Sequence, residues 1–164
     1  MFLYFLKHRF HDLLLPELRF QVLVLIVAEE IPEDAMKLAK AFFPGPLTIV
    51  LPAKKTIPRE ATGGLETIAI RMPNHPIALQ LLKLSGPLCA PSANLSGRPS
   101  PTNAYHVMED LDGKIAAVLD GGQCTVGIES TVIRISPSPM ILRPGMITAE
   151  QIEEVLKKPV QIAG

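Results

Sequence analysis

The alternation of apolar runs with chain breaks from residue 29 onward constrains the fold most. Short apolar segments typical of strands alternate with stretches of helical periodicity, and many of both end at a proline or a glycine. The expected strands are 47–51, 67–71, 88–90, 115–120, 128–135 and 140–142, and the expected helices are 29–43, 76–84, 102–111 and 148–157. Because the two types mix irregularly, we expect an α/β domain with a twisted mixed sheet and helices on its faces.

The domain is expected to occupy residues 29–158, between a divergent N-terminal segment, 1–28, and a tail, 159–164. A chain of 164 residues is long enough to bury a substantial core. The apolar residues 22–27 are compatible with a buried strand. No apolar run reaches the roughly 20 residues that a membrane span needs, so we expect a cytoplasmic protein without membrane contact.

Charge and sulfur content exclude several kinds of site. The chain has 16 Lys and Arg and 16 Asp and Glu. This balance argues against a dedicated nucleic-acid coat, which needs a basic surplus, but it allows a local basic pocket. Cys89 and Cys124 have no paired spacing and the histidines are scattered. We therefore expect reduced thiols and neither a disulfide framework nor a zinc site.

The segment APSANLSGRPSPT, residues 90–102, is the first candidate for binding. It follows an expected short strand and precedes an expected helix, for which Thr102 is a suitable N-cap. Ligands of α/β sheets lie at such positions, where hydroxyls and an amide can bind a carboxylate, a phosphate or a sugar. The pattern alone favours a plain surface loop that caps the next helix over a binding site.

A polar triplet interrupts the apolar strand IESTVIRI, residues 128–135. Alternation places Glu129 and Thr131 on one face and Ser130 on the other. A buried Ser or Thr needs a hydrogen-bond partner, so the triplet indicates either a polar site or, as the structural alternative, an edge strand or a bulge.

Two arginines each stand where an apolar strand ends. Arg71 closes TIAIR, in which Thr67 and Ala69 share its face, and Arg143 precedes a Pro-Gly turn in ILRPG. A guanidinium is a planar fork that suits a carboxylate or a phosphate, although a single arginine is more often a solvated surface residue. The sequence has no phosphate-binding glycine loop, no nucleophile elbow and no zinc-protease motif, so these motifs alone give no reaction.

Six segments together resemble a known family: FPGPLTIVLP, TIAIRMPNHP, APSANLSGRPSPT, DGG, GIESTVIRI and ILRPGMIT, in that order. The series is similar to the YrdC-like family of L-threonylcarbamoyladenylate synthases and extends over about residues 29–156. The resemblance implies a nucleotidyltransferase that forms threonylcarbamoyl-AMP from L-threonine, bicarbonate and ATP and releases pyrophosphate. The product serves the threonylcarbamoyladenosine modification of tRNA. The resemblance also implies a concave ligand cavity lined by positive charge.

The family's contacts carry over to matching positions in this sequence. They imply ATP contacts from Thr67, Ser92, Asn94, Ser100 and Arg143, threonine contacts from Arg71, Ala90 and Ser130, and phosphate contacts from Lys7 and Arg9. No covalent nucleophile is implied, since positioning and charge stabilisation suffice for this chemistry. Mg²⁺ is expected with the nucleotide, and no residue of the sequence is assigned to it. The implied partners are the downstream tRNA-modification machinery and tRNA or double-stranded RNA.

The N-terminal segment departs from the family pattern. Family members begin with a strand and a PTDT-YGL-type motif, followed by K-x-R-P-x-x-[DN]-P-L and a strand that ends in histidine. Residues 7–15, KHRFHDLLL, keep Lys7, Arg9 and Asp12, but Phe10 replaces the proline. The strand-ending histidine is also absent. We therefore expect an N-terminally truncated or frame-disrupted member with weak or no turnover. The alternatives are a catalytically inactive remnant and a module that binds double-stranded RNA or tRNA.

Overall fold

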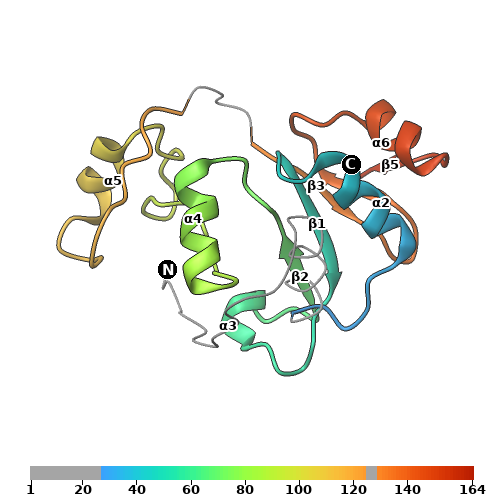
Figure 1. Ribbon diagram of the computed structural model, residues 1–164, viewed down its shortest axis with the longest axis horizontal. Helices are drawn as coiled ribbons and strands as arrows, with labels where there is room; N and C mark the ends of the chain where they lie inside the picture. Colours follow the sequence, from blue (N-terminus) through green and yellow to red (C-terminus); the bar gives the residue numbers. More distant parts are fainter. Residues whose placement is uncertain (1–26, 125–128) are drawn as a thin grey trace. The chain divides into compact units, whose positions relative to one another are not determined.

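The computed structural model describes residues 27–124 and 129–164, which belong to two compact units (Figure 1). The larger unit contains residues 27–87 and 129–164 of this part of the chain and holds the sheet. The smaller unit contains residues 88–124. Residues 1–26, with Lys7, Arg9 and most of the candidate strand 22–27, lie outside the described residues.

The larger unit is built on a five-stranded mixed sheet of order β2-β1-β3-β4-β5. The strands are β1 (Leu47–Pro52), β2 (Thr67–Ile70), β3 (Thr131–Arg134), β4 (Met140–Arg143) and β5 (Gln161–Ile162). β1 pairs with β3 and β4 with β5 in parallel, whereas β1–β2 and β3–β4 are antiparallel. The mixed sheet expected from the sequence is therefore confirmed.

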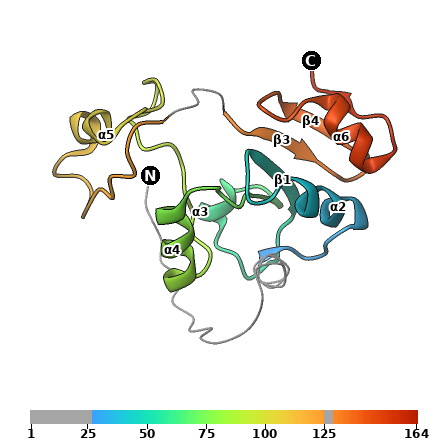
Figure 2. The same cartoon turned by 45° about the horizontal axis from the view of Figure 1, so that its top comes forward.

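Two helices of the larger unit pack together beside the sheet, namely α2 (Glu33–Phe42) and α6 (Ala149–Leu156) (Figure 2). α2 follows Pro32 and carries acidic residues in its first turn, where they complement the helix dipole. α6 begins with the expected capping box between Thr148 and Gln151. The other helices are α3 (Arg59–Thr62) and α4 (Pro76–Ser85) in this unit and α5 (Ala104–Leu111) in the smaller one.

The hydrophobic core lies between one face of the sheet and helices α2 and α6. Alternate residues of the strands point into it, as period-2 alternation requires. The buried residues of this core cluster include Leu47, Ile49, Leu51, Ile133, Ile135 and Ile141 with Ala35, Leu38 and Ala39 of α2 and Ile152 and Leu156 of α6. The residues between them, such as Thr48 and Val50, consequently point to the opposite face of the sheet.

The structure differs from the sequence prediction in the smaller unit. Residues 88–90 and 115–120 were expected as strands but form none. A strand needs a neighbour for its backbone groups, whereas the second segment is mostly exposed, with Leu119 at 64%. The N-cap of α5 is also Asn103 and not Thr102, since the Asn103 side chain accepts a hydrogen bond from the His106 backbone.

Two short elements lacked a sequence signal. α3 spans four residues, too few for a periodic pattern. β5 falls within residues 159–164, the segment interpreted as a tail, and pairs Gln161 with Met140 and Ile162 with Ile141. Within residues 27–124 and 129–164, no helix is long and apolar enough to cross a membrane.

Candidate functional site

Four strand ends meet at one end of the sheet. β1 and β3 run in parallel and begin there, and β2 and β4, which are antiparallel to them, end there. Arg71 directly follows β2, Ser130 directly precedes β3, and Arg143 is the last residue of β4. The topology therefore brings together three residues that are far apart in the sequence.

These side chains share the sheet face that is turned away from the core. In the register, Leu47 stands opposite Thr131 and Thr48 opposite Val132, and Val132 also stands opposite Arg143. Leu47 and Thr131 point into the core, so their neighbours Thr48 and Ser130 point to the other face. This arrangement agrees with the alternation expected for the polar triplet.

Ser130 is the centre of the site and is only 6% exposed. Its Oγ lies 2.9 Å from Thr48 Oγ1. Arg143 donates from Nη2 to the carbonyl oxygen of Ser130 at 2.9 Å and to its Oγ at 3.2 Å, and from Nε to the same carbonyl at 3.3 Å. The polar triplet is thus a hydrogen-bonded cluster and not a plain edge strand.

The two arginines supply positive charge beside this hydroxyl. Arg143 also forms an ion pair between Nη1 and the Glu129 carboxylate. Arg71 donates from Nε to the Gly45 carbonyl at 3.3 Å. In the part of the chain that the structure describes, its two Nη atoms have no hydrogen-bond partner. They remain available to an anionic ligand.

The electrostatics of Arg71 favour such a ligand. Partial burial lowers the pKa of its guanidinium from the ordinary value, and the positive charge of Arg143 lowers that pKa further. Two guanidinium groups that repel each other are stabilised when a carboxylate or phosphate binds between or beside them. The arrangement is chemically suited to an anion with more than one oxygen.

The backbone around Ser130 is fixed by close packing. A Cβ at Gly145 would lie 2.4 Å from the Glu129 carbonyl oxygen, 2.5 Å from the Thr131 nitrogen and 2.6 Å from the Ser130 carbonyl carbon, so only glycine fits. Thr131 donates from its backbone to the Pro46 carbonyl at 3.0 Å. Its Oγ1 also donates to the Ile147 carbonyl at 2.7 Å and accepts from the Ile147 backbone at 2.9 Å.

The polar segment 90–102 belongs to the smaller unit and is folded onto α5. Asn94 donates from Nδ2 to the carbonyls of Leu95 and Arg98, at 2.9 and 2.8 Å. The buried Asp110 of α5 accepts from the Leu95 backbone at 3.1 Å and pairs with the Arg98 guanidinium. These bonds give the loop a defined shape while its candidate contacts Ala90, Ser92 and Ser100 are exposed. The Oδ1 atom of Asn94 is buried without a partner among the described residues.

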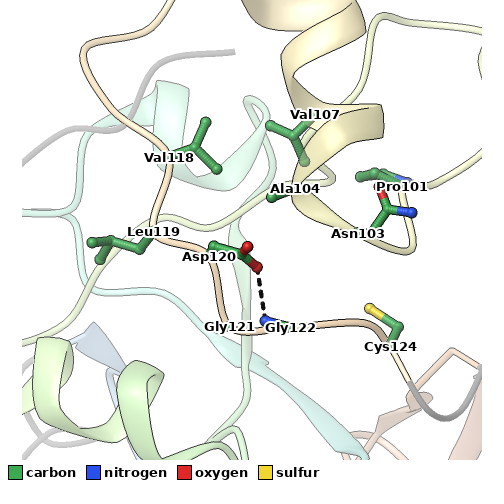
Figure 3. A pocket seen from close by; sticks show the side chains of 10 residues that line it. All are labelled: Pro101, Asn103, Ala104, Val107, Val118, Leu119, Asp120, Gly121, Gly122 and Cys124. Atoms are coloured by element: carbon green, nitrogen blue, oxygen red, sulfur yellow. Dashed lines mark hydrogen bonds between the residues drawn. The ribbon is translucent and has the colours of Figure 1, made fainter.

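The smaller unit also contains a pocket of about 150 Å³ beside α5 (Figure 3). It is lined by Pro101, Asn103, Ala104, Val107, Val118, Leu119, Asp120, Gly121, Gly122 and Cys124. The Asp120 carboxylate accepts from the Gly122 backbone at 2.8 Å and so closes the DGG turn. Apolar side chains dominate the rest of the lining.

Cys89 is partly buried and Cys124 is exposed, and both are free cysteines in the structure. Across residues 27–124 and 129–164, no group of three or more His, Cys, Asp or Glu residues could hold a metal ion.

The structure brings together three of the candidate residues, namely Arg71, Ser130 and Arg143. Thr67 shares the face of Arg71 but lies at the opposite end of β2, where it pairs with Pro52. Ala90, Ser92, Asn94 and Ser100 belong to the smaller unit, and Lys7 and Arg9 lie outside the described residues.

Sequence reasoning missed Thr48 and the two glycines at positions 45 and 145. Thr48 could have been recognised from the sequence, because it places a hydroxyl inside the apolar strand LTIVL. In the structure this residue is only 8% exposed. Such a buried hydroxyl requires a partner. The partner itself, which is 82 positions away in the chain, could not be read from the sequence.

The chain is similar to proteins of one family. The Sua5_yciO_yrdC family model, whose description reads "Telomere recombination", matches residues 11–145. The chain belongs to this family. A threonylcarbamoyl-AMP synthase from Pyrococcus abyssi is 56% identical over 133 residues, which cover 80% of the chain and 39% of that relative. One from Bacillus subtilis is 56% identical over 128 residues, which cover 76% and 37% respectively.

Solved structures agree with this family membership. The crystal structure of P. abyssi Sua5 complexed with L-threonine is 54% identical with a TM-score of 0.79, over 84% of this chain and 41% of that one. E. coli YciO, at 24% identity, has the same fold, with a TM-score of 0.69 over 80% of this chain and 65% of the YciO chain. The chain spans about two fifths of the length of the P. abyssi and B. subtilis relatives. The resemblance and the α/β fold class expected from the sequence are confirmed, whereas the concave cavity stays a prediction.

Proposed function

We propose that the chain acts as an L-threonylcarbamoyladenylate synthase, which converts L-threonine, bicarbonate and ATP into threonylcarbamoyl-AMP and pyrophosphate. One observation carries this proposal: two guanidinium groups and a buried hydroxyl converge at one end of the sheet. Relatives at 56% identity that are named threonylcarbamoyl-AMP synthases support it.

The proposed role of the cluster is to hold the carboxylate of L-threonine. The two Nη atoms of Arg71, which have no partner among the described residues, can bind the carboxylate in a bidentate fork. Ser130 offers its hydroxyl beside them, and Arg143 contributes positive charge toward the phosphates of ATP. The P. abyssi Sua5 structure complexed with L-threonine supports this assignment of the substrate.

ATP is proposed to contact Thr67 on β2 and the hydroxyl and amide groups of Ser92, Asn94 and Ser100, with Ala90 beside the threonine. Lys7 and Arg9 are proposed phosphate contacts. Mg²⁺, when bound, would be held mainly by the phosphates and would neutralise their charge.

The reaction needs two bond-forming steps. In the first step the threonine amine attacks the carbon of bicarbonate, and a carbamate forms with loss of water. In the second step a carbamate oxygen attacks the α-phosphate of ATP and displaces pyrophosphate. Neither step needs a protein nucleophile, because both rest on positioning and on stabilising negative charge. The product would pass to enzymes that transfer the threonylcarbamoyl group to tRNA in the cytoplasm.

We expect the purified 164-residue chain to release pyrophosphate from ATP in the presence of bicarbonate and L-threonine, slowly but dependent on threonine. The measurement is a coupled pyrophosphate assay, and its control is the same reaction without threonine. Equal rates with and without threonine would contradict the proposal. Salt-sensitive RNA binding without any pyrophosphate release would instead favour the RNA-binding alternative.

A further inference from the structure

The hydroxyl of Thr48 is buried at the centre of the sheet, next to Ser130. Thr48 lies on β1, between Leu47 and Ile49, which point into the core. Its Oγ1 lies 2.9 Å from Ser130 Oγ and has no other hydrogen-bond partner in the part of the chain that the structure describes. A buried hydroxyl with a single partner depends on that partner.

The hydrogen bonds around Ser130 Oγ restrict which way its proton can point. A hydroxyl has one proton to donate and two lone pairs with which to accept. Arg143 has no acceptor atoms, so its contact of 3.2 Å with Ser130 Oγ uses one lone pair of the serine. The bond with Thr48 can run in either direction. If Ser130 donates to Thr48, no proton is left for a ligand; if Thr48 donates to Ser130, the serine proton is free.

A carboxylate ligand decides between these two directions, because an ionised carboxylate can only accept hydrogen bonds. Its binding at Ser130 requires the serine proton, and the Thr48 proton must then go to Ser130 Oγ. In that state both lone pairs of the serine oxygen are occupied, and each bond in the chain from Thr48 to Ser130 to the ligand strengthens the next.

We propose that Thr48 is a positioning residue for the amino-acid substrate, since its hydroxyl donates to Ser130 and directs the serine proton to the substrate carboxylate. This inference rests on the proposed function, which supplies the carboxylate. If Thr48 acted only by filling space, Thr48→Val would leave L-threonine binding unchanged, because valine has nearly the same shape as threonine but no hydroxyl.

The test is a double-mutant cycle with the variants Thr48→Val, Ser130→Ala and the combination of both. The Kd for L-threonine is measured by isothermal titration calorimetry on the full chain, and thermal melting confirms that each variant folds. We expect Thr48→Val to raise the Kd about fivefold to tenfold, in the range for loss of one buried hydrogen bond. In the Ser130→Ala background the same change should have less than about a twofold effect, because the two residues act through one contact.

Two controls separate the hydroxyl from the space it occupies. Thr48→Ser keeps the hydroxyl and should restore the Kd to within about twofold of the wild-type value. Thr56→Val makes the same chemical change at an exposed turn position and should leave the Kd unaltered.

The outcomes distinguish this inference from the proposed function. If wild-type protein binds L-threonine but Thr48→Val has the same effect with and without Ser130, the positioning role is wrong and the function stands. The same holds if Thr48→Val has no effect. If wild-type protein does not bind L-threonine at all, the proposed function is wrong, and the inference falls with it.

Discussion

Replacing Arg71 by alanine is expected to cause the largest loss of L-threonine affinity of any single side-chain truncation in the site. The substitution removes two Nη atoms that have no hydrogen-bond partner among residues 27–124 and 129–164. A hydrogen bond to a charged group contributes about 1.5–3 kcal/mol, so the loss of even one such bond should raise the Kd by roughly tenfold to more than a hundredfold. Isothermal titration calorimetry with L-threonine measures this change.

Two further variants make the Arg71 result specific. Arg71→Lys keeps the positive charge but loses the planar fork, so its Kd should fall between those of the wild type and Arg71→Ala. Arg59→Ala removes an exposed arginine that also donates to a backbone carbonyl, that of Gly64, and it should leave the Kd unchanged. An Arg71→Ala variant that binds L-threonine as tightly as the wild type would remove this residue from the site.

Gly145→Ala is expected to destabilise the larger unit strongly. The added Cβ would approach three backbone atoms of Glu129, Ser130 and Thr131 to within 2.4–2.6 Å, and backbone atoms cannot rotate away as a flexible side chain can. Such overpacking costs about 1–3 kcal/mol and occasionally more, and we expect a value near the upper end. Urea unfolding followed by circular dichroism measures the loss in free energy of unfolding.

The same substitution should also weaken L-threonine binding, because the segment that must move carries Ser130. Gly164→Ala is the control: nothing lies within 4 Å of the added Cβ, and the free energy of unfolding should change by less than about 0.5 kcal/mol. A Gly145→Ala protein with wild-type stability would show that the turn after β4 is not packed against the start of β3 as described.

Local sequence patterns predicted most elements of the larger unit. The apolar run LTIVL became β1, whose alternate residues are buried between the sheet and the helices, and TIAIR became β2, whose partly buried Ile70 packs against the same core. The Thr148 capping box marked the start of α6, and it acts within one helical turn; α2, in contrast, begins at Glu33, directly after Pro32, and not at residue 29 as predicted. Signals of this kind need no knowledge of distant residues.

The failures arose where a segment depends on a distant neighbour. Residues 115–120 are apolar enough for a strand, but among the described residues no strand pairs with them. β5, in contrast, has only two residues and forms because β4 offers it a backbone edge. The prediction of the site was limited in the same way, by contacts between residues that are distant in the sequence. Ser130 and Arg143 were found as isolated candidates, whereas their contact with each other and with Thr48 follows from strand register alone.

The central claim is that L-threonine binds where β1 and β3 begin and β2 and β4 end. A titration of isotope-labelled protein with L-threonine, followed by amide chemical-shift mapping, tests this claim most directly. We predict that the largest shifts occur at Gly45, Thr48, Arg71, Ser130 and Arg143. Shifts confined to the lining of the pocket beside α5, for example Val118 and Leu119, would contradict the claim, as would a spectrum that L-threonine leaves unchanged.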